Sequence, residues 1–111
     1  SELVRSLSDR IASRYRNTFY AFNEYNEPTI EDEFAKILAG GFSKIVVVPV
    51  FMASGAHLGE EIPNKLAIPP GSGGSVIDHE GHPVRICYQE PFGMDPRLND
   101  ILAAKISGPA N

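Results

Sequence analysis

The sequence feature that most constrains the fold is an apolar run, Ile45-Val46-Val47-Val48-Pro49-Val50-Phe51, which follows Lys44. Successive side chains of a strand point to opposite faces, so this run is apolar on both faces. Strands of this kind occur in parallel sheets that helices cover on either side. We therefore predict a central parallel strand over residues 44–51.

Segments with helical periodicity lie on both sides of this run, and each carries one apolar stripe. These amphipathic segments are residues 2–15, 30–38 and 98–106. Thr29 and Asp95 stand where N-caps are expected, and Gly40-Gly41 is typical of a helix end. A fourth, shorter helix is expected over residues 58–66, where Pro63 limits its length.

Two further regions have the composition of strands. Residues 18–22 are β-branched and aromatic, which predicts a short buried strand. Val76-Ile77 and Val84–Tyr88 flank the turn-forming sequence Asp78-His79-Glu80-Gly81, which predicts a β-hairpin. Pro69–Gly74, before the hairpin, is too rich in proline and glycine for regular structure.

Helices and strands thus alternate with short connections, and this order predicts an α/β fold with right-handed parallel crossovers. A length of 111 residues suits one compact domain, so we predict a single α/β domain over residues 1–111. Its expected architecture is three layers around a mainly parallel sheet, with a small β-hairpin insertion. A parallel α/β domain usually begins with a strand, whereas this sequence begins with a helix. We therefore expect a first strand that the printed sequence lacks.

Composition and charge exclude several classes of function. Ten Lys and Arg residues stand against fourteen Asp and Glu residues, and no basic cluster is visible, which argues against binding to nucleic acid. No apolar run approaches the roughly 18 residues of a membrane span, so we expect a soluble protein without a membrane partner. Cys87 is the only cysteine, which excludes an intrachain disulfide and suits a cytoplasmic location.

The loops that follow the strands are the expected location of any site, because ligands of open parallel sheets bind at the carboxyl ends of strands. Glu24 and Glu27 follow the first predicted strand, His57 follows the apolar run, and Glu90–Gly93 follow the last strand. An imidazole among carboxylates binds borderline divalent metals and exchanges protons near neutral pH. His57 is therefore a candidate site residue, although its position also fits a surface or helix-capping role.

Two other polar patterns carry less information. His79 and His82 lie three residues apart in the predicted hairpin turn, where two imidazoles either hold a metal weakly or belong to a solvated polar turn. Gly71–Gly74 lacks the Gly-Lys-Ser/Thr ending of a phosphate-binding loop. The sequence also lacks a Gly-x-Ser-x-Gly nucleophile elbow, so a hydrolase has little support.

Four segments in a fixed order carry a resemblance to a known family. They are Ala21–Ile30, Ile45–Phe51 followed by Gly55-Ala56-His57, Glu61-Ile62-Pro63, and Glu90–Gly93 with Asp95–Leu98. Together they resemble the small sirohydrochlorin chelatases of the CbiX and CfbA type, which insert cobalt or nickel into a tetrapyrrole. The resemblance covers nearly the whole chain, and the glycine-rich loop and hairpin turn are similar to the archaeal members.

The resemblance implies a chelatase-like fold, a homodimer, and a reaction in which divalent cobalt or nickel enters sirohydrochlorin, with no permanently bound cofactor. It implies that His57 is catalytic and ligates the metal, that Glu27 contacts the substrate, and that Glu24 is a further candidate. The loop implied to lie against the macrocycle consists of Met52, Ala53, Ser54, Gly55, Ala56 and His57. The carboxylates of the substrate need basic partners, for which Lys65, Arg85 and Arg97 are candidates.

Members of this family carry a second histidine in a Gly-His-Gly motif that ends the first strand. The printed sequence begins at what resembles the first helix, so we expect this strand and motif to be either deleted from the protein or encoded upstream of Ser1. A non-catalytic tetrapyrrole or metal carrier and a sirohydrochlorin ferrochelatase of sirohaem synthesis stay open as alternatives. The metal stays open too, because affinity rises from iron through cobalt to nickel at most imidazole sites.

Overall fold

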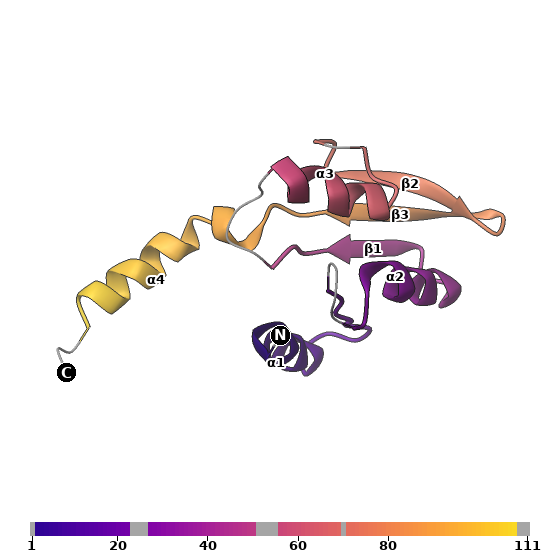
Figure 1. Ribbon diagram of the computed structural model, residues 1–111. Coiled ribbons are helices and arrows are strands. Elements are labelled where there is room, and N and C mark those ends of the chain that lie inside the picture. Colours follow the sequence, from indigo (N-terminus) through magenta and orange to yellow (C-terminus); the bar gives the residue numbers. More distant parts are fainter. Residues whose placement is uncertain (1, 23–26, 51–55, 70, 109–111) are drawn as a thin grey trace.

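The computed structural model describes residues 2–22, 27–50, 56–69 and 71–108, and for residues 56–60 only the backbone. Its elements in chain order are α1 (Glu2–Ala12), α2 (Ile30–Ala39), β1 (Lys44–Val47), α3 (Ala56–Lys65), β2 (Gly74–His79), β3 (His82–Tyr88), the short 3-10 helix η1 (Phe92–Met94) and α4 (Arg97–Ile106) (Figure 1). None of the helices in these ranges is both long and apolar enough to cross a bilayer.

The three strands form one mixed sheet in the order β1-β3-β2. β1 pairs with β3 in parallel, and β2 pairs with β3 antiparallel as the predicted hairpin. The connection from β1 to its parallel partner contains α3, as a crossover in an α/β fold requires. The α/β class and the β-hairpin predicted from the sequence are therefore confirmed. The sheet was expected to be mainly parallel, whereas within the described residues it has one parallel and one antiparallel pair of strands.

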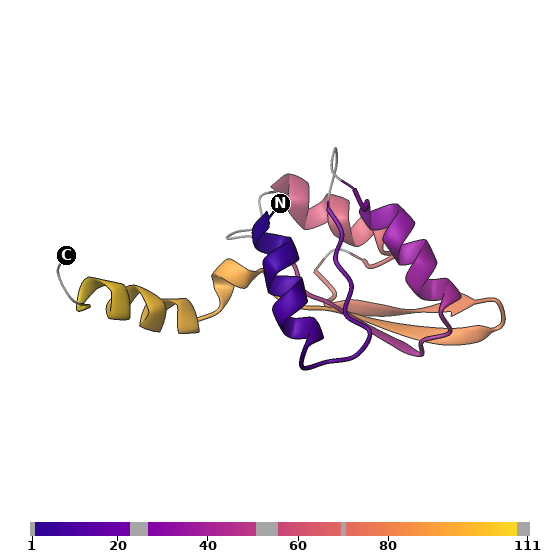
Figure 2. The same cartoon turned by 90° about the horizontal axis from the view of Figure 1, so that it is seen from below.

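The hydrophobic core lies between β3 and the helices α2 and α3, which Figure 2 shows on the same side of the sheet. The fully buried side chains of Val84 and Ile86 point into this core from β3. The remaining buried members are Ile62, Leu66 and Ile68, and the partly buried Phe34 and Leu38 of α2 pack against them. Burial of these apolar side chains is the main force that holds both helices on the sheet.

The opposite face of the sheet is open at two positions. Val46 of β1 is 53% exposed and Val76 of β2 is 61% exposed. Within the described residues, β1 pairs with β3 alone and so stands at an edge of the sheet, although the sequence predicts a central strand. The pattern of apolar residues on both faces identified the strand, although β1 ends at Val47, earlier than predicted. The pattern carried no information on which strands lie beside it.

The predicted strand over residues 18–22 is wrong, because these residues form no ladder with another strand in the part of the chain that the structure describes. Phe22 makes one isolated parallel bridge with Thr29. The N–H of Phe22 donates to the carbonyl of Pro28 at 2.8 Å, and the N–H of Ile30 donates to the carbonyl of Phe22 at 3.2 Å. These bonds close a local loop, so strand-like composition was not enough to form a strand without a partner.

The last helix also differs from its prediction. Its start agrees, since the Asp95 side chain accepts a hydrogen bond from the backbone N–H of Arg97 at 2.9 Å. Its apolar stripe was expected to be buried, yet Leu102 is 60% exposed and Ile106 is 82% exposed. Figure 1 shows α4 extending away from the sheet, so the stripe has no covering surface within the described residues.

The ends of α2 agree with the sequence prediction, and the ends of α3 differ from it. The Thr29 hydroxyl accepts a hydrogen bond from the N–H of Asp32 at 3.1 Å, which confirms the predicted N-cap of α2. Gly41 after this helix has a φ of +80°, a left-handed conformation that glycine adopts without steric cost. The helix predicted over residues 58–66 begins earlier, at Ala56, and continues through Pro63 to Lys65, so Pro63 does not limit it.

Candidate functional site

The carboxyl ends of β1 and β3 meet at one edge of the sheet. Val47 pairs with Tyr88 in the parallel register, and the N–H of Gln89 donates to the carbonyl of Val47 at 2.9 Å. Beyond this pair, the N–H of Phe92 donates to the carbonyl of Pro49 at 3.0 Å. These bonds hold the loops after both strands side by side, at the edge where open parallel sheets bind ligands.

His57 belongs to the first turn of α3, which begins at Ala56. Figure 1 shows this end of α3 on the side of the sheet where β1 and β3 end. The side chain of His57 lies outside the described residues, and so do Met52, Ala53, Ser54 and Gly55. The backbone therefore brings the predicted metal ligand to the carboxyl edge of the sheet, as expected for a loop that follows β1.

Glu27 precedes α2 and its side chain is exposed. Figure 1 shows that α2 begins on the same side of the sheet as the carboxyl ends of the strands, so Glu27 and His57 belong to the same side of the molecule. The bridge between Phe22 and Thr29 holds the two ends of the intervening loop together. Glu24, within that loop, lies outside the described residues.

Lys65, Arg85 and Arg97 are the candidate partners of the substrate carboxylates, and two of them, Lys65 and Arg97, form ion pairs with acidic residues of this chain. The Nζ of Lys65 lies 3.4 Å from Oε2 of Glu31 and 3.5 Å from Oε1 of Glu61, which links α3 to α2. A hydrogen bond from its own backbone and the charge of Lys65 hold the pKa of Glu31 below 4.5. Arg97 forms an ion pair with Asp95. Arg85 lies on β3, where its side chain is exposed.

Tyr88, the last residue of β3, is a polar side chain at the carboxyl edge that the sequence reasoning did not single out. Burial raises the pKa of its phenol above the usual value of 10.0. The available signal was its position, since it is the last residue of a predicted core strand and precedes a candidate loop. A half-buried phenol at this edge can donate a hydrogen bond to a ligand.

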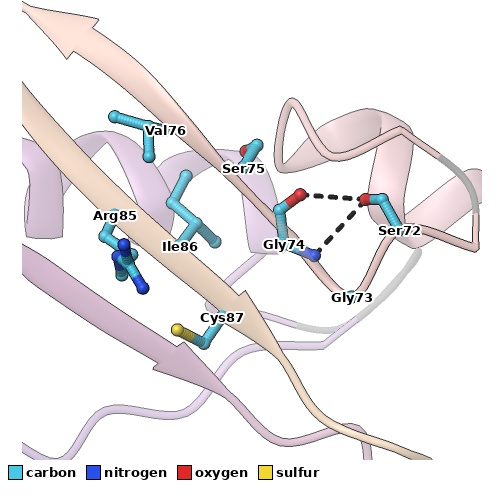
Figure 3. Close-up of a pocket in the computed structure, with 8 residues that line it drawn as sticks. All are labelled: Ser72, Gly73, Gly74, Ser75, Val76, Arg85, Ile86 and Cys87. Carbon is cyan, nitrogen blue, oxygen red and sulfur yellow. Dashed lines mark hydrogen bonds between the residues drawn. The ribbon is translucent and has the colours of Figure 1, made fainter.

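A shallow hollow of about 250 Å³ lies elsewhere, beside the glycine-rich loop (Figure 3). The Oγ of Ser72 donates to the carbonyl of Gly74 at 2.9 Å and accepts from its N–H at 3.3 Å. The lining residues are Ser72, Gly73, Gly74, Ser75, Val76, Arg85, Ile86 and Cys87. Arg85, a candidate partner of the substrate carboxylates, lines the hollow, but His57 and Glu27 do not. Ligand pockets commonly span about 300–1,000 Å³, so this hollow is not the candidate site.

No group of three or more His, Cys, Asp or Glu side chains is arranged to hold a metal within the part of the chain that the structure describes. That part excludes the side chain of His57, so the predicted metal ligand is outside this search. A second hollow of about 400 Å³ lies between α1, the segment 18–20 and α2, with Thr18, Phe19 and Glu33 among its lining residues. This second hollow contains none of the predicted site residues.

Comparisons with known proteins agree on one family. The family model described as CbiX matches residues 1–108. A sirohydrochlorin cobaltochelatase of Methanosarcina acetivorans is 33% identical over 107 residues, which is 95% of this chain and 82% of the relative. The corresponding enzyme of Saccharolobus islandicus is 33% identical over 96 residues, which is 86% of this chain and 73% of the relative.

A solved structure supports the fold. It is described as a CbiX protein of cobalamin (vitamin B12) biosynthesis from Marinobacter aquaeolei VT8, and it superimposes with a TM-score of 0.64. The alignment covers 95% of this chain and 80% of that protein, at 21% sequence identity. Because the family model spans nearly the whole sequence and two relatives are 33% identical, this chain belongs to the CbiX family.

Proposed function

We propose that this protein is a sirohydrochlorin chelatase that inserts divalent cobalt, or nickel, into the macrocycle. The observation that carries the proposal is the match to CbiX over residues 1–108, together with relatives that are named sirohydrochlorin cobaltochelatase. The position of His57 supports it, because this residue stands in the first turn of α3 beside the carboxyl edge of β1. Residues 1–111 would act as one chelatase domain.

Metal insertion requires that a divalent ion is held over the ring while two pyrrole protons leave. In the proposed mechanism the neutral imidazole of His57 ligates the incoming ion and positions it over the macrocycle. The ring loses two protons and gains one dication, so its net charge does not change. A group that accepts protons near neutral pH is needed, and an imidazole or a carboxylate can serve.

Glu27 is the proposed substrate contact, with Glu24 as a further candidate. Glu27 is exposed and precedes α2 on the side of the sheet where α3 begins. A carboxylate there can accept a hydrogen bond from a pyrrole N–H or receive a departing proton. Residues 52–57 are proposed as the segment that lies against the macrocycle, because they include the last part of the connection from β1 and the start of α3 at Ala56.

We also propose that two copies of the chain form the working enzyme in the cytoplasm. Exposed apolar surface supports the dimer, since Ile101 and Leu102 of α4 are 48% and 60% exposed, and large apolar patches mark interaction sites. Light scattering is expected to give about twice the 12.1 kDa of one chain. Leu102→Lys is expected to shift the protein to one copy, and a parent protein that is already monomeric would refute the dimer.

An absorbance assay tests the proposed reaction. Anaerobic sirohydrochlorin is mixed with Co²⁺, Ni²⁺ or Fe²⁺ in the presence and absence of the protein, and the change of the macrocycle spectrum is followed. Proton-transfer catalysis contributes about 10²–10⁴-fold, so we expect insertion of Co²⁺ or Ni²⁺ to exceed the spontaneous rate by a similar factor.

Each other result selects a different function. Acceleration with Fe²⁺ alone would identify a ferrochelatase. Binding of the macrocycle without acceleration by any of the three ions would identify a carrier and refute the chelatase. The binding control is a fluorescence titration of sirohydrochlorin with the protein in the absence of metal, which separates a carrier from a protein that does not bind the macrocycle.

A further inference from the structure

The tip of the β2–β3 hairpin holds two histidines in a fixed relationship. Glu80 and Gly81 connect the strands, with φ values of +49° and +91°. Two central residues with positive φ are the mark of a type I′ turn, whose twist matches that of the flanking strands. The turn therefore fixes the register, and in this register His79 and His82 are direct partners.

Direct partners of an antiparallel pair point to the same face of the ribbon. The ring centroids of His79 and His82 lie 6.2 Å apart, with 75° between the ring planes. When two imidazole rings share a metal ion, each nitrogen lies about 2.0–2.1 Å from it, which places the two ring centroids roughly 4.5–5 Å apart. Rotation about the side-chain bonds must therefore bring the two rings closer together before one nitrogen of each can reach a common ion.

The surroundings leave this pair open to solvent ions. His82 is exposed and His79 is half-buried. Asp78 pairs with Pro83 and, because strand side chains alternate, lies on the other face of the ribbon. No third metal-ligating side chain joins the two histidines among the described residues, so water would complete the coordination of the ion.

We propose that His79 and His82 form a two-histidine site for divalent late transition-metal ions, separate from the site at the carboxyl edge of the sheet. Imidazole suits nickel, copper, cobalt and zinc, and the order of affinity places Cu²⁺ above Ni²⁺ and Ni²⁺ above Co²⁺. Two protein ligands with water in the remaining positions give a site that exchanges its ion. The proposal rests on the hairpin alone and does not depend on the chelatase reaction.

Nickel alone, without sirohydrochlorin, is the probe. Paramagnetic Ni²⁺ is added in substoichiometric amounts to isotope-labelled protein, and the broadening of each backbone amide signal is followed by NMR. We expect the signals of residues 79–82 to broaden first. In His57→Ala, the same signals are expected to broaden at the same nickel concentration, because the hairpin pair does not involve His57.

Single substitutions separate a shared ion from two independent imidazoles. If one ion bridges both rings, His79→Gln and His82→Gln each weaken Ni²⁺ binding at the hairpin at least about tenfold, or about 1.4 kcal/mol. If each variant keeps the parent affinity at its remaining histidine, the two rings bind independently and the proposal is wrong.

A rearranged variant keeps the number of histidines and changes only their placement. Asp78→His combined with His79→Asp puts one imidazole on each face of the ribbon, because neighbouring strand residues point to opposite faces. We expect this double variant to lose as much Ni²⁺ affinity as His79→Gln, while amide signals outside the hairpin stay in place. Parent-like affinity in the double variant would refute chelation by the pair.

Discussion

Val47 of β1 and Tyr88 of β3 are direct partners in the parallel register of the sheet. This pairing aligns the carboxyl ends of the two strands, and the chain continues from there into residues 48–55 and into the first turn of α3. The position of His57 in the backbone therefore depends on the packing that holds β1, β3 and α3 together. Predictions about stability and about the reaction test different parts of this arrangement.

The core between β3 and the two helices should be sensitive to loss of volume. Ile86 is 1% exposed, so Ile86→Ala removes buried apolar contacts and leaves a cavity that costs about 2–5 kcal/mol of the free energy of unfolding. Ile106→Ala is the matched control, because this side chain is 82% exposed and its loss should change stability by less than about 0.5 kcal/mol. Urea unfolding of both variants measures the difference, and similar values for the two would contradict the observed core.

Close packing of the two hairpin strands requires glycine at position 74. A Cβ added there would lie 2.5 Å from the carbonyl oxygen of Ile86, which is backbone and has little room to move. Gly74→Ala is therefore expected to cost about 1–3 kcal/mol through overpacking. Val76→Thr, on the exposed face of the same strand, should stay within about 0.5 kcal/mol. Chemical denaturation that leaves Gly74→Ala as stable as Val76→Thr would show that the strands separate easily.

The start of α4 should respond to acid. Hydrogen bonds from the Arg97 side chain and backbone lower the pKa of Asp95 from 3.8 to about 2. Because the pKa is lower in the folded state, the stability that this pair adds is fully present above pH 3.8 and is lost as the pH falls through about 2. NMR titration of the Asp95 carboxyl carbon measures the midpoint, and Arg97→Gln should move it upward toward 3.8. An unchanged midpoint in that variant would exclude the Arg97 side chain as the cause.

Local sequence signals predicted the elements whose structure depends on neighbouring residues. Thr29 caps α2, Gly41 ends it in a left-handed conformation, and the turn after His79 forms the hairpin, each through contacts only a few residues apart. The apolar run after Lys44 likewise identified β1. In these places the local chemistry and the fold agree, which explains why inspection of the sequence was sufficient.

The errors concern partners that are distant in the sequence. Phe22 belongs to a segment with strand-like composition, yet a strand needs a neighbour for its hydrogen bonds, and composition does not identify one. Ile106 lies on a regular apolar stripe, and periodicity shows which side of a helix is apolar without showing what covers it. For the site, the order of elements predicted the edge at which His57 lies. The pairing of Tyr88 with Val47 was not predicted, because it depends on the register between two strands that are distant in the sequence.

The central claim is that His57 holds the metal during insertion. The measurement is the initial rate at which sirohydrochlorin takes up Co²⁺, followed by absorbance, for the parent protein, His57→Ala and Asn99→Ala, an exposed position on α4. We predict that His57→Ala loses at least about a hundredfold of the rate above the spontaneous reaction, with an unchanged unfolding midpoint, while Asn99→Ala keeps the parent rate. A His57→Ala protein that inserts Co²⁺ as fast as the parent would contradict the account.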